Sequence, residues 1–273
     1  MSKPGANRFE TMLARNHDFA GRTLEPGFPL AAFNQLQAWQ QQRLGCTFAD
    51  LNEREHYRPA IDFFLSEVYG GLDFRERDQD MGQVMPVMIR FLPDRALVTL
   101  SEAFELQAIS LEFDERMARF MEERRIEVLD MDNYGEVYRE CSDREGRERQ
   151  ILLIHKLGYD LDKLVQKSWI NYLVRMLRGP AIAAGFGRLQ GFLESGLESF
   201  RALNDATWFV DTIYEQARKM LDLDGLIGIL KQQGYPQADL QMEALEEELL
   251  KYSNAIRLDD DLTFVEIRLQ KHD

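Results

Sequence analysis

Apolar residues recur at helical spacing along most of the chain. In the stretch 96–127 they fall on one face of a helix, with glutamate and arginine residues on the other: Leu97, Leu100, Phe104, Ile109, Phe113, Met117, Phe120 and Met121. Residues 33–44 and 147–178 show the same amphipathic spacing. We therefore predict a mainly α fold, in which a multi-helix globular bundle occupies residues 33–222.

The beginning of the chain differs from this pattern, because glycine and proline interrupt any helical period there. The interrupting residues are Gly5, Gly21, Pro26, Gly27 and Pro29. We predict an irregular N-terminal arm over residues 1–32.

The last forty residues follow a third pattern. Residues 238–252 have the spacing of an acidic helix, and residues 263–269 alternate apolar and polar side chains as a half-buried strand does. We predict that residues 234–273 form a short acidic α/β appendage, a helix followed by a strand or a hairpin. Because a lone strand is only marginally stable, it needs a partner in the same chain or in another molecule.

The charge balance narrows the classes of partner. The chain of 273 residues carries 33 Lys and Arg against 47 Asp and Glu, a formal net charge of −14. A surface this acidic repels phosphate backbones, so we expect no nucleic-acid partner. Two cysteines, Cys46 and Cys141, cannot build a disulfide scaffold and fit a reducing compartment. With no secretory h-region and no long apolar run, we expect a cytoplasmic protein without a transmembrane segment.

Against this acidic background, the segment 156–188 is basic. Its cations are Lys156, Lys163, Lys167, Arg175, Arg178 and Arg188, against only Asp160 and Asp162. Aromatic side chains lie among these cations, and such a helix can dock on an acidic partner or on a membrane surface. We predict a partner-binding surface made of Trp169, Tyr172, Arg175, Arg178 and Arg188, and favour a protein over peripheral membrane contact. The alternative is a core-facing helix whose polar side is basic.

Histidines supply the other candidate chemistry. Glu53 and His56 have the spacing of half a di-iron site, but no second Glu-x-x-His motif accompanies them. We interpret His56 as a surface or helix-start residue. His155 lies in an apolar stretch, where a buried histidine making one hydrogen bond is the favoured interpretation over a ligand or a proton-transfer group.

Part of the chain resembles a family of bacterial helical proteins of uncharacterised function. The segments that carry the resemblance are Phe63-Phe64-Leu65-Ser66-Glu67-Val68-Tyr69-Gly70, Asp73-Phe74, Arg77-Asp78, Leu92-Pro93 and Glu105-Leu106-Gln107-Ala108. The resemblance covers residues of about 33–215 and implies a helical fold without implying an activity.

A second resemblance is confined to the C-terminus. The segment Asp259-Asp260-Asp261-Leu262-Thr263-Phe264-Val265-Glu266-Ile267 resembles the final strand of metal-dependent serine/threonine phosphatases of the sporulation type. In those enzymes an aspartate of this signature holds a divalent cation, which implies a metal-binding role for Asp260 with Mg²⁺ or Mn²⁺. A single carboxylate does not make the two-metal site that such hydrolysis needs.

Taken together, these patterns favour a non-catalytic interaction or regulatory protein that binds another protein, or a second copy of itself. The basic-aromatic helix and the C-terminal strand would carry this function, and no cofactor is expected. Two alternatives stay open, a phosphatase-like hydrolase completed by a partner chain and a helical-bundle carrier of a ligand or a metal.

Overall fold

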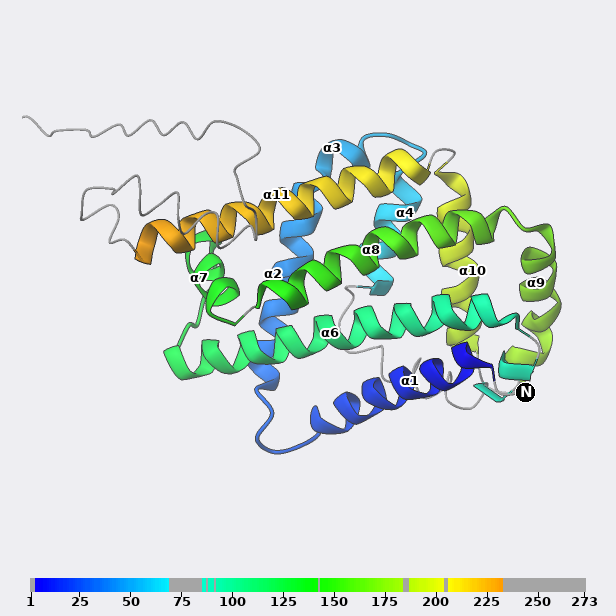
Figure 1. Ribbon diagram of the computed structural model, residues 1–273, viewed down its shortest axis with the longest axis horizontal. Coiled ribbons are helices and arrows are strands. Elements are labelled where there is room, and N and C mark those ends of the chain that lie inside the picture. The colour runs from blue at the N-terminus through cyan, green and yellow to red at the C-terminus, as the bar shows by residue number, and fades with distance from the viewer. Residues whose placement is uncertain are drawn as a thin grey trace, which may run out of the picture. The chain divides into compact units, whose positions relative to one another are not determined.

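The computed structural model describes residues 3–68, 85–86, 88–90, 92–141, 143–183, 187–203 and 206–232. The chain divides into two compact units, Met1–Lys219 and Met220–Asp273, and the first holds the helices up to the early turns of α11. Every regular element in the described residues is helical, as Figure 1 shows. The elements are α1 (Pro4–Arg22), α2 (Leu30–Thr47), α3 (Ala49–Asn52), α4 (Arg58–Phe63), the π-helical turn η1 (Phe64–Val68), α6 (Asp94–Arg124), α7 (Met131–Cys141), α8 (Arg144–Val165), α9 (Ser168–Ala183), α10 (Gly187–Ala202) and α11 (Ala206–Gln232).

This architecture confirms the mainly α class. The predicted C-terminal helix and strand over residues 234–273 lie outside the described residues.

The N-terminal stretch is helical, and the prediction of an irregular arm over residues 1–32 is wrong for most of its length. Pro4 opens α1, where its missing N–H would have no partner in any case. Phe9, Leu13 and Phe19 are buried along one face of this helix. Gly5 lies in the first turn, and a Cβ there would stand 2.7 Å from the carbonyl oxygen of Asp94. This glycine therefore permits the close approach of α1 to the start of α6.

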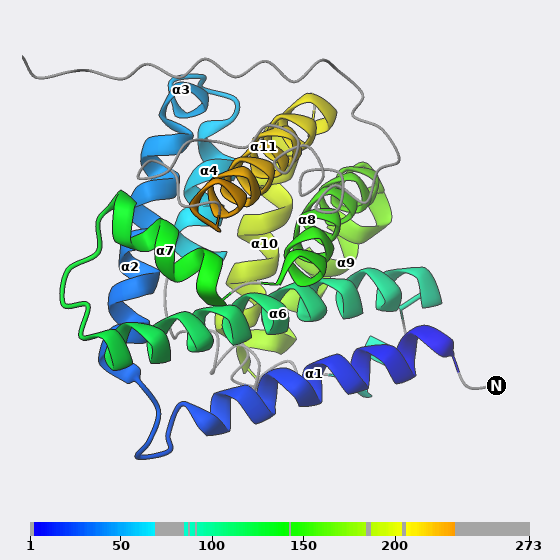
Figure 2. The ribbon, with the colours of Figure 1, turned by 60° about the vertical axis from the view of Figure 1, so that its left-hand side comes forward.

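α6 is the helix on which α1 and α8 are aligned. Arg15 pairs with Glu112 and Arg22 with Glu115, so α1 and α6 run in the same direction. α8 runs the opposite way, because residues late in α8 meet residues early in α6. Figures 1 and 2 both show these three helices side by side. α6 ends at Arg124, and the next residue, Arg125, caps the helix with a left-handed backbone at φ 55°.

In the part of the first unit that the structure describes, three buried clusters of apolar side chains hold the helices together. The largest lies among α1, α2, α6 and α7 and is centred on Phe33, Leu36 and Met117. A second joins α4, α8, α10 and the start of α11 around Ala60, Leu203 and Phe209. The third packs Phe9 of α1 on Leu97 and Phe104 of α6. Burial of these apolar side chains supplies most of the favourable free energy of such a bundle.

The predicted helical stretch 147–178 is two helices rather than one. α8 ends at Val165, and α9 begins at Ser168. α9 then packs against α10, where the Gln190 side-chain amide donates to the Val174 carbonyl at 2.8 Å.

Candidate functional site

Among the side chains of α9 that the structure describes, four large apolar ones are exposed. Their exposed fractions are 45% for Trp169, 71% for Tyr172, 52% for Met176 and 57% for Ile182. The guanidinium-bearing residues Arg175 and Arg178 lie on the same helix and are also exposed. We call these six residues, together with Arg188, the α9 surface. Exposed aromatic and arginine side chains in one place are the composition that distinguishes the core of a protein interface from ordinary surface.

α10 holds α9 in place from behind. Gln190 is buried, and besides its bond to Val174 its amide donates to Glu194 at 2.9 Å. Glu194 also pairs with Arg178, with 3.7 Å between Oε2 and Nε. The bond from Gln190 ties α10 to the backbone of α9, while Arg178 stays 65% exposed beside Glu194 and Trp169 and Tyr172 stay exposed to solvent.

The structure brings the five predicted partner-binding residues to two packed helices. Trp169, Tyr172, Arg175 and Arg178 are on α9, and Arg188 is the second residue of α10 and is exposed. The alternative that this helix turns its aromatic face to the core does not hold for Trp169 and Tyr172. Asp260, the predicted metal ligand, lies outside the described residues.

Lys156 does not belong to the same surface, although the sequence counts it in the basic segment. Its ammonium group donates to Glu102 and, at 2.9 Å, to Asp160. Burial acts to lower the pKa of Lys156, but the hydrogen bonds to Glu102 and Asp160 outweigh it and raise this pKa. The positive charge of Lys156 is therefore compensated by two carboxylates of its own molecule.

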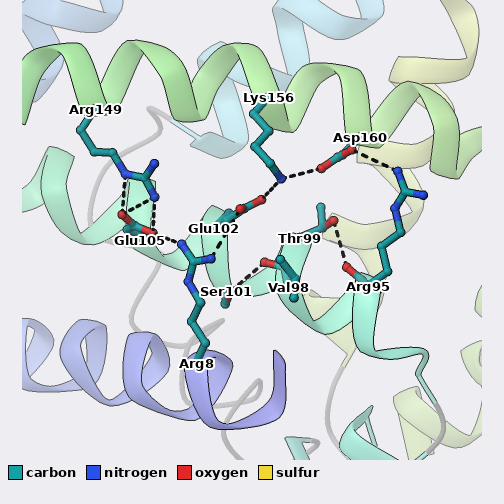
Figure 3. Close-up of polar contacts among 10 residues, drawn as sticks. All are labelled: Arg8, Arg95, Val98, Thr99, Ser101, Glu102, Glu105, Arg149, Lys156 and Asp160. Carbon is teal, nitrogen blue, oxygen red and sulfur yellow. Dashed lines mark hydrogen bonds and ion pairs between the residues drawn. The ribbon is translucent and has the colours of Figure 1, made fainter. Parts of the chain in front are cut away.

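Lys156 is part of a network of ion pairs that joins α1, α6 and α8, drawn in Figure 3. Glu105 of α6 lies at its centre, because it accepts hydrogen bonds from Arg8 of α1 at 2.6 Å and from Arg149 of α8 at 2.8 Å. Burial tends to raise the pKa of Glu105, yet the bonds from Arg149 and Arg8 bring it below its usual value. The network fixes how α8 lies along α6, and so where α9 begins.

His155 takes part in a second polar cluster, between α8 and the first turns of α11. Its Nε2 lies 2.9 Å from Oδ1 of Asp211, and the Tyr159 hydroxyl donates to the same carboxylate at 2.9 Å. The hydrogen bonds from His155 and Tyr159 lower the pKa of Asp211. The predicted single hydrogen bond of His155 is confirmed, whereas its predicted full burial is not, because the side chain is 31% exposed. Sequence reasoning missed Asp211 altogether.

A third cluster places a carboxyl group in the largest core. Burial raises the pKa of Asp114 to about 6, although the hydrogen bond from Gln40 and the charge of Arg147 oppose the rise. The Arg147 guanidinium stacks between aromatic rings, 3.9 Å from the centroid of Phe113 and 4.2 Å from that of Tyr138. Because Asp114 and Arg147 are enclosed by aromatic rings and amide groups, we interpret this cluster as a buried polar network that supports the packing of the bundle.

The surface of the described residues includes two open hollows of about 480 Å³ each. One is lined by Arg116, Arg119, Phe120, Glu123, Glu140, Cys141 and Asp143, and the other by Pro59, Gly191, Glu194, Ser195, Glu198, Ser199 and Ala202. Burial raises the pKa of the Cys141 thiol to about 11, so this thiol is almost wholly protonated near neutral pH and is a poor nucleophile. Neither hollow combines a base with an activated nucleophile.

Among the described residues, no three His, Cys, Asp or Glu side chains come together in a way that could hold a metal ion. Glu53 and His56 therefore gain no further ligands in that part of the chain. No helix in the described ranges is long and apolar enough to cross a membrane.

Over the described residues these observations show a helical fold on which the basic-aromatic helix α9 is exposed. A family described as "Domain of unknown function (DUF8198)" matches residues 26–223, and the chain belongs to this family. The matched range includes every segment by which the sequence resembles a helical family, and it excludes the phosphatase-like segment at 259–267. No curated protein and no solved structure matches the chain.

Proposed function

We propose that this protein is a non-catalytic interaction protein that binds another protein through the α9 surface. The observation that carries the proposal is the outward-facing group of Trp169, Tyr172, Met176 and Ile182 on one helix of 16 residues. Leaving such side chains in water costs free energy that burial against a partner would recover, at about 25 cal/mol per Å² of apolar area. Aromatic side chains and arginine are also the residues that most often dominate binding energy at interfaces.

The charge of α9 defines the chemistry of the partner. The helix contains Arg175 and Arg178 and has no acidic residue in its sequence. It belongs to a chain whose net charge is −14, so its basic character is local. A partner surface that is apolar at its centre and acidic at its rim would match it, and the opposite charges would speed association.

The C-terminal strand predicted over residues 263–269 is proposed as a second contact, because an unpaired strand can join the edge of a partner's sheet. Deletion of residues 234–273 should weaken partner binding and leave the helical circular dichroism signal of the first unit in place.

Site-specific photo-crosslinking in the cells that produce the protein tests the α9 surface. A photoreactive phenylalanine derivative replaces Tyr172, and a matched control carries it in place of Leu152, which is 50% exposed on α8. We expect a discrete adduct from position 172 only, identified by mass spectrometry. Arg175→Glu combined with Arg178→Glu should reduce it by about fivefold or more.

Equal yields of crosslinked adduct from positions 172 and 152 would indicate non-specific contacts rather than a binding site. If the yield of adduct is unchanged when both arginines are replaced by glutamate, the proposal that an acidic partner recognises the charge of α9 is refuted.

A further inference from the structure

A second exposed apolar surface lies beside the C-terminal end of α6, on the loop before α2, the loop before α7 and the first residue of each of these two helices. Its members are Leu24 at 73% exposed, Leu30 at 42%, Val128 at 73% and Met131 at 64%. The loops that carry them belong to one region. The Gln35 side chain donates to the Glu127 carbonyl at 2.7 Å, and Arg119 donates to the Gly27 carbonyl at 3.2 Å.

This second surface is acidic. The exposed acids on and beside the two loops are Glu25, Glu122, Glu123, Glu127 and Asp130, and they outnumber the exposed cations there, which are Arg119, Arg124 and Arg125. We call the four apolar residues and these acids the acidic end. It therefore has the chemistry required of a partner for the α9 surface, with apolar side chains surrounded by negative charge.

The two surfaces are too far apart to meet within one molecule. α6 has 31 residues and at 1.5 Å per residue is about 45 Å long. The acidic end follows the last turn of α6. The end of α8 lies beside the first turn of α6, where Arg95 and Asp160 are 3.8 Å apart, and α9 comes directly after α8. Figures 1 and 2 show α9 and α7 at opposite ends of α6 in both views.

We propose that the partner of the α9 surface is the acidic end of a second copy of this chain. This inference rests on the proposed function and names the partner of the same surface. The contact is head-to-tail, because two different surfaces meet, and each bound copy leaves one α9 surface and one acidic end open. Addition can therefore continue, and the assembly grows with concentration instead of stopping at two copies.

The size of the surface sets the strength of the contact. A helix of 16 residues is about 24 Å long, so one helix face against two loops belongs to the class of small interfaces below about 1,200 Å². Association is accordingly weak and is observed in a concentration series from about 5 to about 500 µM.

A charge-exchange experiment on the full chain tests the proposal by sedimentation velocity. One variant carries Arg175→Glu and Arg178→Glu, and the other carries Glu25→Arg and Glu127→Arg. Each variant alone presents like charges at the contact and should sediment as a single chain of 31.8 kDa. An equimolar mixture restores opposite charges at every contact and should recover the wild-type rise in average mass, past twice that of one chain.

Four outcomes overturn the inference: a wild-type protein that stays at 31.8 kDa over the whole series, growth that ends at two copies, a variant that associates like wild type, and a mixture that fails to associate. Circular dichroism and thermal unfolding of both variants confirm that they are folded. If the wild type stays a single chain while position 172 still crosslinks to a different protein, the head-to-tail contact is refuted and the proposed function stands.

Discussion

Replacing Asp114 by asparagine should stabilise the protein, and the gain should depend on pH. The pKa of this buried carboxyl group is about 6 in the folded chain, against 3.8 for an ordinary aspartate. Between these two pH values the unfolded chain releases the proton while the folded chain keeps it. The free energy of unfolding therefore falls as pH rises from 3.8 and levels off above the folded-state value, a loss of about 3 kcal/mol in all.

Asp114→Asn removes this loss, because an amide does not ionise and its carbonyl oxygen can still accept from Gln40. Urea unfolding followed by circular dichroism, from about pH 4 to about pH 8, measures the difference between variant and wild type. The difference should favour the variant increasingly with pH, by about 2 to 3 kcal/mol over the range.

Glu10→Gln is the control for the change in net charge, because Glu10 is exposed on α1 and belongs to neither proposed binding surface. The reasoning about the buried carboxyl group is refuted if the free energy of unfolding of Asp114→Asn differs from that of wild type by the same amount at every pH. It is also refuted if the difference favours wild type increasingly as pH rises.

Two further predictions concern packing and thiol reactivity. Gly158→Ala should lower the free energy of unfolding by about 1 to 3 kcal/mol, because the added Cβ would lie 2.4 Å from Cγ2 of Val210. A second substitution in the same chain, Val210→Ala, should recover part of this loss. Losses in urea denaturation that simply add would contradict this close contact. Iodoacetamide at about pH 7.5 should modify the exposed Cys46 about tenfold or more faster than Cys141, whose pKa of about 11 keeps it protonated. Peptide mass spectrometry measures both rates, and equal rates would contradict the prediction.

The helical class could be predicted because the spacing of apolar residues is a local property. The predicted stretch 96–127 corresponds to α6 at Asp94–Arg124. The same spacing occurs in α1, where Phe9, Leu13 and Phe19 lie on one face, but the nearby glycines and prolines mask it when they are counted without regard to their position. Pro4 and Gly5 lie in the first turn and Gly21 in the last, where their cost to a helix is small. Whether a glycine or proline prevents a helix therefore depends on its position in the helix more than on its presence.

The separation of α8 from α9 has no comparable signal in the sequence. The residues between Val165 and Ser168 are Gln166 and Lys167, which are acceptable in the interior of a helix. The break results from tertiary packing, because Val165 is buried in one core cluster while α9 packs on α10.

The candidate site was predictable where it depends on composition and unpredictable where it depends on distant pairs. The composition of the sequence points to the aromatic residues and cations of α9, but it leaves open whether Trp169 and Tyr172 face solvent or the core, and their exposure is a finding of the structure. The pairing of Lys156 with Glu102 joins residues 54 apart in sequence, and that of His155 with Asp211 joins residues 56 apart. Periodicity contains no information on such pairs, because they depend on how whole helices align.

The ion pairs among α1, α6 and α8 determine alignment more than stability. Lys156 is half exposed, and the Arg95–Asp160 pair has an exposed arginine and a separation of 3.8 Å, so each pair contributes at most about 1 kcal/mol. The buried clusters supply the larger share of the stability, while the ion pairs select one register of α8 along α6. Since α9 follows directly from α8, this register sets where the α9 surface faces. Binding should therefore tolerate the loss of any one ion pair and depend instead on the arginines and aromatic side chains of α9 itself.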